Sequence, residues 1–305
     1  MDARTRWGPE GRQAAVAFSF DHLGEAADLE FGRWPPDRPV GRHHSALRDV
    51  PALLDALPAK VSFYVESWSL DVYPETVRAI VDAGHELGCH GMRHERWSDL
   101  TPDQERDHLE RCRRDFERHA IELLGLRPPG GVAAKSSASV VREQGLRYIS
   151  PVGVASGVLD GDLAVLETSA AAADVAFYSA PFVRYRRYKP GPQTLTPQDL
   201  VDGFMAEVER AVEAGSFIAP VCHPFMQSST PDRTDPARIE AIAEVVRRLV
   251  RDDRVWLATG AEIAEWMLDN ADGVPSVRSL EPPEWLDPAQ HHSMHLQVKR
   301  GSQAA

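Results

Sequence analysis

Reactive side chains follow apolar runs at four places in this 305-residue chain. They are Asp21 and His22 after AAVAFSF (14–20), His90 and His94 in HGMRH, Arg127 at the start of RPPGG, and His223 after FIAPVC (217–222). If these runs are parallel β-strands, their carboxyl ends share the edge of the sheet at which α/β enzymes place reactive groups. We therefore expect the four clusters to converge on one site.

His90 and His94 have the spacing of a metal site. Two imidazoles four residues apart, on a helical turn or a tight loop, can bind one divalent ion, and neutral imidazole is a common ligand for zinc. A catalytic site also requires a third ligand and an open position for water. The spacing alone is weak evidence, because a chain with 12 histidines also contains such pairs at surface and capping positions.

The order of the predicted elements indicates an α/β fold. Apolar runs typical of buried strands alternate with amphipathic helices, which predicts parallel βαβ units in a barrel or an open doubly wound sheet. We predict strands at 14–20, 60–65, 85–91, 146–153, 217–222 and 255–259, and helices at 45–58, 73–84, 101–125, 137–145, 196–215, 235–252 and 260–270. Residues 160–198 show no clear pattern.

One catalytic domain over residues 1–274 fits this organisation, because we find no internal repeat and no linker. After about residue 275 the chain becomes rich in proline and polar residues. We interpret residues 275–305 as a polar C-terminal arm or disordered tail, and HHSMH (291–295) as part of it.

Composition excludes several classes of protein. The formal net charge of −12 is opposite to the basic surface that nucleic-acid binding requires. Three cysteines without a CxxC pair do not form a disulfide framework and fit a reducing compartment. The polar residues 1–13 do not resemble a signal peptide, and no apolar run reaches the roughly 18 residues of a membrane span. We expect a cytoplasmic protein with no membrane partner.

Taken together, the clusters resemble the motifs of the polysaccharide deacetylase family of metal-dependent carbohydrate esterases. SFDH (19–22), GHELGCHGMRH (84–94), RPPGG (127–131) and VCHP (221–224) occur in the order of the family's motifs. HPF (223–225) and RVWLATGAEIAEWM (254–267) are most similar to the subgroup of cytoplasmic peptidoglycan-deacetylase-like proteins and metal-free allantoinases. The resemblance covers roughly residues 14–268 and implies a distorted (β/α) barrel.

The resemblance implies a role for each matched residue. Asp21 is expected to be the general base that activates water, oriented by the guanidinium of Arg127. His90 and His94 are expected to bind the metal, and His223 is expected to be the general acid that protonates the leaving amine. Amide hydrolysis requires a water nucleophile, a polarised carbonyl and a proton for nitrogen, which these groups together supply.

The chain departs from the family at His22, which stands where the family has a second, metal-binding aspartate. If His22 binds, the site has three histidines and favours zinc, with cobalt or nickel as alternatives. If His22 points away, the metal is weakly held or absent. Glu25 is then a replacement ligand, unless it is a solvated loop carboxylate. Asp174 is the nearest candidate for the aspartate that pairs with the late histidine.

Substrate contacts are expected from Trp34 and His44, in the loop after the first strand, and from Pro129. RYRRYK (184–189) is a basic and aromatic segment in an acidic protein. It binds an acidic substrate, covers the site or contacts another subunit.

We expect an amide hydrolase that removes an N-acyl group, with acetyl as the first choice, from a small molecule such as an amino sugar or a biosynthetic intermediate. One alternative is a cyclic amide or ureide ring-opening hydrolase without a metal, and another is an inactive binding relative. The subgroup's tetramers imply a homo-oligomer, either a dimer or a tetramer.

Overall fold

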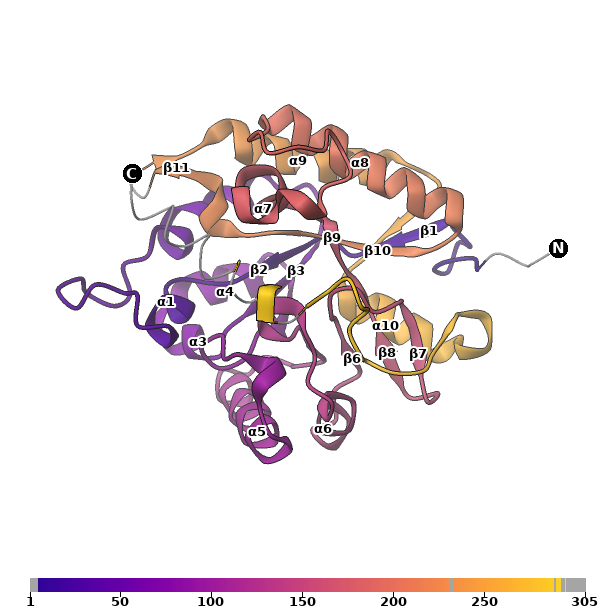
Figure 1. The fold of residues 1–305 in the computed structure, drawn as a ribbon, viewed down its shortest axis with the longest axis horizontal. Coiled ribbons are helices and arrows are strands. Elements are labelled where there is room, and N and C mark those ends of the chain that lie inside the picture. Colours follow the sequence, from indigo (N-terminus) through magenta and orange to yellow (C-terminus); the bar gives the residue numbers. More distant parts are fainter. Residues whose placement is uncertain (1–4, 231–232, 288, 292–293, 295–305) are drawn as a thin grey trace.

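The fold is known from a computed structural model, which describes residues 5–230, 233–287, 289–291 and 294 (Figure 1). Its framework is one curled β-sheet with helices packed around it. The strands are β1 (Ala14–Val16), β2 (Ser19–Asp21), β3 (Ser62–Val65), β4 (Glu86–Cys89), β5 (Gly125–Leu126), β6 (Tyr148–Ile149), β7 (Gly157–Leu159), β8 (Leu163–Val165), β9 (Thr168–Ala173), β10 (Phe217–Cys222), β11 (Ser228–Thr230), β12 (Arg233–Thr234), β13 (Val255–Leu257) and β14 (Ser276–Val277).

In the described part of the chain, twelve strands pair in one sheet. Their order is β13-β1-β10-β2-β3-β4-β5-β6-β8-β7-β14, with β9 beside β10. The pairs from β13 to β8 are parallel, and the β7–β8 hairpin in this sheet is antiparallel. β11 and β12 form a separate antiparallel pair. The predicted distorted (β/α) barrel is confirmed, as a sheet that curls without closing. The carboxyl ends of its central strands meet at one end of the barrel.

Helices lie on the outside of this sheet, with α8 and α9 on one side of the molecule and α5 and α6 on the other (Figure 1). The α-helices are α1 (Ala26–Glu30), α2 (Val50–Ala56), α3 (Trp68–Val72), α4 (Pro74–Asp82), α5 (Pro102–Arg118), α6 (Ser137–Glu143), α7 (Asp174–Tyr178), α8 (Pro197–Ala214), α9 (Pro236–Arg251) and α10 (Gly260–Asp269). A π-helical turn, η1 (Ser45–Asp49), precedes α2, and the 3₁₀ turns are η2 (Trp97–Asp99), η3 (Pro129–Gly131), η4 (Ala180–Tyr185), η5 (Pro224–Gln227) and η6 (Ala271–Gly273).

The helix α5 begins with a capping box. The side chain of Thr101 accepts a hydrogen bond from the backbone N–H of Gln104, whose side chain accepts one in return from the N–H of Thr101. The predicted end of this helix at Gly125 is wrong. The helix stops at Arg118, and Ala120 turns the chain with φ of 54°. Gly125 instead begins β5, because the ring of Tyr148 packs where a side chain would project.

The first predicted strand, 14–20, is two strands in the structure. β1 and β2 are separated by Ala17 and Phe18, and β10 runs along both of them. On the other side, β13 pairs with β1 and β3 pairs with β2. The interruption lets a single run of sequence pair with different neighbours at its two ends.

The amino end of the barrel is closed by α10. The hydroxyl groups of Tyr64 and Tyr148 are hydrogen-bonded to each other at 2.9 Å inside the barrel. The backbone N–H of Gly260 donates to Ser62 Oγ at 2.8 Å, and that of Ala261 donates to Glu86 at 3.1 Å. The carboxyl termini of the strands lie at the opposite end, which α10 leaves open.

The boundary predicted at residue 274 does not separate a detached arm from the described structure. β14 pairs with β7 in the sheet, and Leu280 and Leu286 are buried. His291, predicted to lie in a polar arm or disordered tail, is also buried. Residues 288, 292–293 and 295–305 of that arm lie outside the described residues. No helix of the described chain is both long enough and apolar enough to cross a membrane.

Candidate active site

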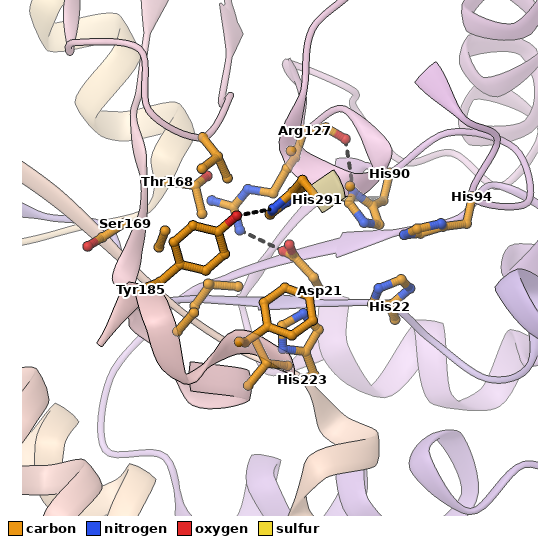
Figure 2. Close-up of a pocket in the computed structure, with 18 residues that line it drawn as sticks. Asp21, His22, His90, His94, Arg127, Thr168, Ser169, Tyr185, His223 and His291 are labelled. Carbon is orange, nitrogen blue, oxygen red and sulfur yellow. Dashed lines mark hydrogen bonds and ion pairs between the residues drawn. The ribbon is translucent and has the colours of Figure 1, made fainter. Parts of the chain in front are cut away.

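The four reactive clusters predicted from the sequence converge on one pocket at the carboxyl ends of the strands (Figure 2). Asp21 is the last residue of β2, His22 follows it, His90 follows β4, Arg127 follows β5 and His223 follows β10. These residues and His94 line a cavity of about 50 Å³. Because the strands are parallel, each delivers its side chain at the same edge.

Arg127 fixes the carboxylate of Asp21. Its Nη1 lies 2.6 Å from Asp21 Oδ1 and 2.7 Å from Ser19 Oγ, and its Nη2 donates to Ser150 Oγ at 3.0 Å. The guanidinium also stacks 3.9 Å from the ring centre of Tyr64 and is 1% exposed. A buried cation held on three sides keeps the Asp21 carboxylate in one orientation, as a general base requires.

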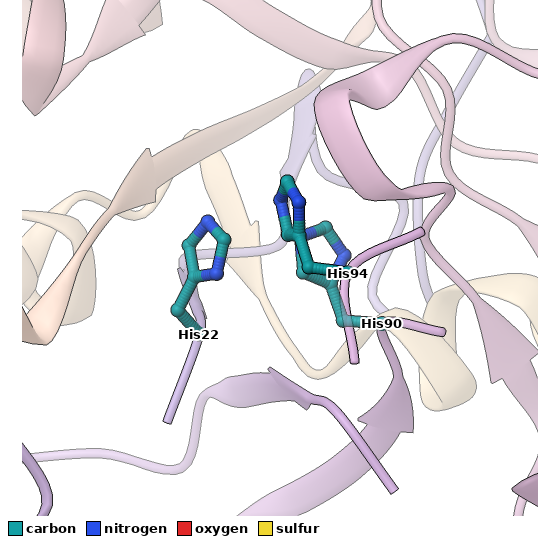
Figure 3. A group of neighbouring side chains, drawn as sticks. All are labelled: His22, His90 and His94. Carbon is teal, nitrogen blue, oxygen red and sulfur yellow. The ribbon is translucent and has the colours of Figure 1, made fainter. Parts of the chain in front are cut away.

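His22, His90 and His94 form a group that could bind a metal ion (Figure 3). One ligand atom of each lies within 4.8 Å of the others, and all three side chains are buried. Burial lowers the pKa of His90 to about 4, so its imidazole is neutral near pH 7 and able to bind. Its Nδ1 lies 2.9 Å from the carbonyl oxygen of Arg127, which leaves Nε2 for the site. This donor set fits a zinc-like divalent ion.

The backbone is in an unusual conformation at two of these histidines. His22 has φ of 74° and His94 has φ of 73°, both in the left-handed region that residues with a side chain rarely adopt. Such residues cluster at functional sites, where the surrounding structure holds them. The conformation turns both imidazoles toward His90.

Asp174 lies directly behind His223, as expected for the partner of the late histidine. His223 Nδ1 lies 2.6 Å from Asp174 Oδ1, and the His223 backbone N–H donates to Oδ2 at 2.7 Å. Gln227 Nε2 donates to the same Oδ2 at 2.9 Å. The carboxylate therefore holds the imidazole so that Nε2 faces the cavity. Nothing in the 160–198 pattern showed that Asp174 begins a helix at this point.

Glu25 does not belong to the pocket, so the expectation that it replaces a metal ligand is wrong. It is fully buried, hydrogen-bonded to the hydroxyl of Tyr73 and accepting the N–H of Gly41 at 2.6 Å. It is therefore neither a ligand nor a solvated carboxylate, and it fixes the loop after β2.

The three expected substrate contacts are also absent from the described residues that line the pocket. Trp34 packs beside His43 and donates to the carbonyl of Arg38 at 3.0 Å. His44 Nδ1 lies 2.8 Å from Asp49 Oδ2. Pro129 lies against Gly91, while its neighbours Gly130 and Gly131 reach the cavity. Trp34 and His44 make their contacts within the loop after β2, and other segments form the wall of the cavity.

Three wall residues were missed in the sequence. Phe182 and Tyr185 come from η4, and His291 comes from the C-terminal segment. Tyr185 Oη lies 3.0 Å from His291 Nδ1, and the Phe182 ring packs edge-on to the His291 ring (Figure 2). Tyr185 belongs to RYRRYK, one of whose predicted roles was to cover the site. No pattern in the sequence pointed to His291.

Comparison with known proteins agrees with this geometry. Residues 15–149 match the family model for polysaccharide deacetylase. Residues 15–149 are thus a polysaccharide deacetylase domain by this match. The match includes Asp21, His22, both histidines of HGMRH and Arg127, whereas His223 and His291 lie beyond it.

Other polysaccharide deacetylase relatives match over different lengths. A peptidoglycan deacetylase-like protein of Gibberella zeae is 37% identical over 71 residues, which are 23% of this chain and 20% of the relative. The match thus spans about a fifth of that relative's length. The crystal structure of a candidate polysaccharide deacetylase from Mycobacterium smegmatis aligns with a TM-score of 0.74 and 26% identity, covering 93% of this chain and 99% of that one.

An allantoinase shares the polysaccharide deacetylase fold. The crystal structure of Puue allantoinase aligns with a TM-score of 0.66 and 16% identity, over 87% of this chain and 93% of that one. At this identity the likeness concerns the fold. The sequence resemblance of HPF and the last helix was to a subgroup that contains both deacetylase-like proteins and allantoinases. The solved structures that align with this chain include proteins of both names.

Proposed function

We propose that this protein is a metal-dependent amide hydrolase that removes a short acyl group, with acetyl as the first candidate, from the nitrogen of a small molecule. The observation that carries the proposal is the convergence of Asp21, His223 and three histidines on one cavity. A carboxylate base, an imidazole acid and a metal site are the groups that hydrolysis of an amide requires.

Asp21 is the general base. Its carboxylate accepts the proton of the attacking water, and the hydrogen bond from Arg127 holds it in place for that step. Ser19 and Ser150 hold the guanidinium in turn, so that the base cannot rotate away from the cavity. Positioning of this kind removes much of the entropic cost of the reaction.

His223 is the general acid. It gives a proton from Nε2 to the nitrogen of the leaving amine, while Asp174 accepts the hydrogen bond from Nδ1 and stabilises the charged ring. The second oxygen of Asp174 is held by the His223 backbone and by Gln227, so the pair keeps its geometry as the proton moves.

His22, His90 and His94 are the metal ligands, with zinc as the first candidate and cobalt or nickel as alternatives. The metal, when bound, supplies Lewis acidity toward the acyl carbonyl. The three side chains are buried and come from two loops, after β2 and after β4, that the parallel pairing of the strands brings together.

The size of the pocket supports a small substrate. A cavity of about 50 Å³ holds the volume of only a few water molecules. Its wall is apolar at Val152, Ala170, Ala173 and Val175. A short acyl chain fits such a wall, whereas a polymer strand would require an open groove.

The test is acyl release by protein loaded with zinc, measured on a panel of N-acetyl and N-formyl amines and amino sugars. The Asp21→Asn variant keeps the size of the side chain and removes the base. It is expected to lower kcat by roughly 10²- to 10⁴-fold, the usual contribution of a general base. Zinc content measured in the same samples controls for loss of the metal.

Two outcomes would overturn the proposal. Opening of cyclic amides or ureides by the wild-type protein, without release of acetate or formate, would replace it with ring opening. Binding of N-acyl ligands without turnover, in protein with full metal content, would identify an inactive binding relative.

A further inference from the structure

A second buried carboxylate, Glu66, lies directly behind His22. Glu66 follows the last residue of β3 and is fully buried. Its Oε1 lies 2.7 Å from His22 Nδ1, and its Oε2 accepts the backbone N–H of Leu23 at 3.1 Å. One carboxylate thus holds both the ring of His22 and the backbone that follows it. Glu66 does not line the cavity, so it has no part in the roles proposed above.

The contact decides which nitrogen of His22 is available to a metal. An ionised carboxylate only accepts hydrogen bonds, so His22 Nδ1 carries the proton and Nε2 has the lone pair. His90 is arranged in the same way, with Nδ1 toward the carbonyl oxygen of Arg127. Figure 3 shows the ring of His22 facing those of His90 and His94. In two of the three ligands, His22 and His90, a hydrogen-bond acceptor at Nδ1 therefore holds the ring on the side opposite the metal site.

Glu66 also supplies charge. Three neutral imidazoles leave the two positive charges of a divalent ion uncompensated. Asp21, the nearest carboxylate in the cavity, is already paired with Arg127. Glu66 is in direct contact with His22, with its Oε1 2.7 Å from His22 Nδ1. A carboxylate hydrogen-bonded to a ligand histidine makes that histidine more basic and a better ligand.

The backbone contact has its own effect. His22 has φ of 74°, a conformation that costs free energy for a residue with a side chain. The bond from Leu23 N–H to Glu66 holds the chain just after this residue. The same carboxylate therefore stabilises the turn that points His22 into the site.

We propose that Glu66 is a positioning residue for the metal: it fixes the tautomer and direction of His22 and supplies a negative charge behind it. This inference rests on the proposed function only in that His22, His90 and His94 bind a metal. Glu66 acts through His22 and does not touch the substrate or the metal.

The experiment measures zinc affinity on the full chain by competition with a chromophoric chelator, after the metal has been stripped and restored. Glu66→Gln keeps the shape and an acceptor oxygen but removes the charge. It is expected to weaken zinc binding by roughly 10- to 100-fold, the usual effect of losing such a partner. The matched control is Glu86→Gln, a half-buried glutamate at the first residue of β4 whose carboxylate is bonded to Ser62 and Tyr148. It is expected to leave zinc affinity unchanged.

A double-mutant cycle separates positioning from general damage to the fold. If Glu66 acts through His22, adding Glu66→Gln to His22→Ala causes no further loss of zinc affinity. Additive losses in the double variant would overturn the inference, and so would wild-type affinity in Glu66→Gln. If the wild-type protein binds neither zinc, cobalt nor nickel, the metal site itself fails. That failure is distinguishable, because it appears before any variant is compared.

Discussion

The side chain and the backbone of Arg127 serve different parts of the site. The guanidinium holds Asp21 through Nη1 and is itself held by Ser19 and Ser150. The carbonyl oxygen of the same residue holds His90 Nδ1 at 2.9 Å. A change of side chain therefore disturbs the proposed base and leaves the support of the metal ligand in place.

Arg127→Lys separates these two functions. Lysine keeps the charge but cannot reach Asp21, Ser19 and Ser150 together, because a compact ammonium lacks the planar fork of arginine. We expect kcat to fall by roughly 100-fold, within the range by which a misplaced general base affects the rate. Steady-state kinetics on zinc-loaded protein measures the loss, and chelator competition on the same samples is expected to give wild-type affinity. Loss of zinc in parallel with activity would contradict this division.

Prediction at the level of single residues succeeded where a reactive side chain follows a strand. The cavity is lined by all five residues predicted in this way, which are Asp21, His90, His94, Arg127 and His223. The ends of the strands can be recognised in the sequence, and parallel pairing of the strands brings those ends together. The same rule points to Glu66, directly after KVSFYV, which was overlooked. Glu25 was misplaced because its contacts with Tyr73 and Gly41 join segments far apart in the sequence.

At the level of elements, the end of α5 shows why a stop without glycine is hard to predict. The N–H of Ile121 donates to the carbonyl of Phe116 at 3.0 Å, and that of Ala120 donates to Glu117 at 3.0 Å. This pattern closes a helix on a left-handed residue, a position usually filled by glycine. Here Ala120 occupies that position with φ of 54°. The prediction instead placed the end of the helix at Gly125, the nearest glycine downstream.

Ala120→Gly is expected to stabilise the protein. The left-handed backbone conformation costs alanine about 1 kcal/mol of free energy, whereas glycine adopts it without this cost. Ala120 is exposed, so its methyl group contributes no packing that the substitution would remove. We expect the free energy of unfolding to rise by about 0.5–1 kcal/mol, measured by urea denaturation. The control is Ala206→Gly, inside α8, which is expected to lower it by about 1 kcal/mol. Equal losses in both variants would contradict the assignment of the helix end.

The segment 160–198 resisted prediction for a different reason. It contains the three-residue strand β8, the alanine-rich strand β9 (TSAAAA) and the five-residue helix α7. Elements this short have too few residues to show the periodic spacing of apolar side chains that identifies a helix or a strand. They form because β9 pairs with β10 and β8 pairs with β6, both of which lie outside the segment.

At the scale of the whole molecule, residues from the first and the last segments of the described chain line one site. The proposed base lies near the start, and His291 lies near the end. The last segment joins the sheet at β14, packs Leu286 against Val132 and Val152, and then reaches Tyr185. A boundary at residue 274 could not foresee this, because proline-rich polar sequence looks the same whether or not it packs. The expected homo-oligomer and cytoplasmic location stay predictions.

His291→Ala is expected to change the preference for acyl length. Removing the imidazole enlarges a cavity of about 50 Å³ at the wall shared with Phe182 and Tyr185. A pocket that gains room for one or two methylene groups shifts relative kcat/KM by roughly 10- to 200-fold. We expect the ratio of kcat/KM for N-butyryl over N-acetyl substrate to rise by about 10-fold. The matched control is Tyr185→Phe, which removes the hydroxyl bonded to His291 and Arg184 and keeps the ring in place. Because that variant leaves the volume of the wall unchanged, its ratio is expected to stay near the wild-type value. An unchanged ratio in His291→Ala would mean that the C-terminal segment lies away from the acyl group, and that the limit on substrate size is set by the barrel alone.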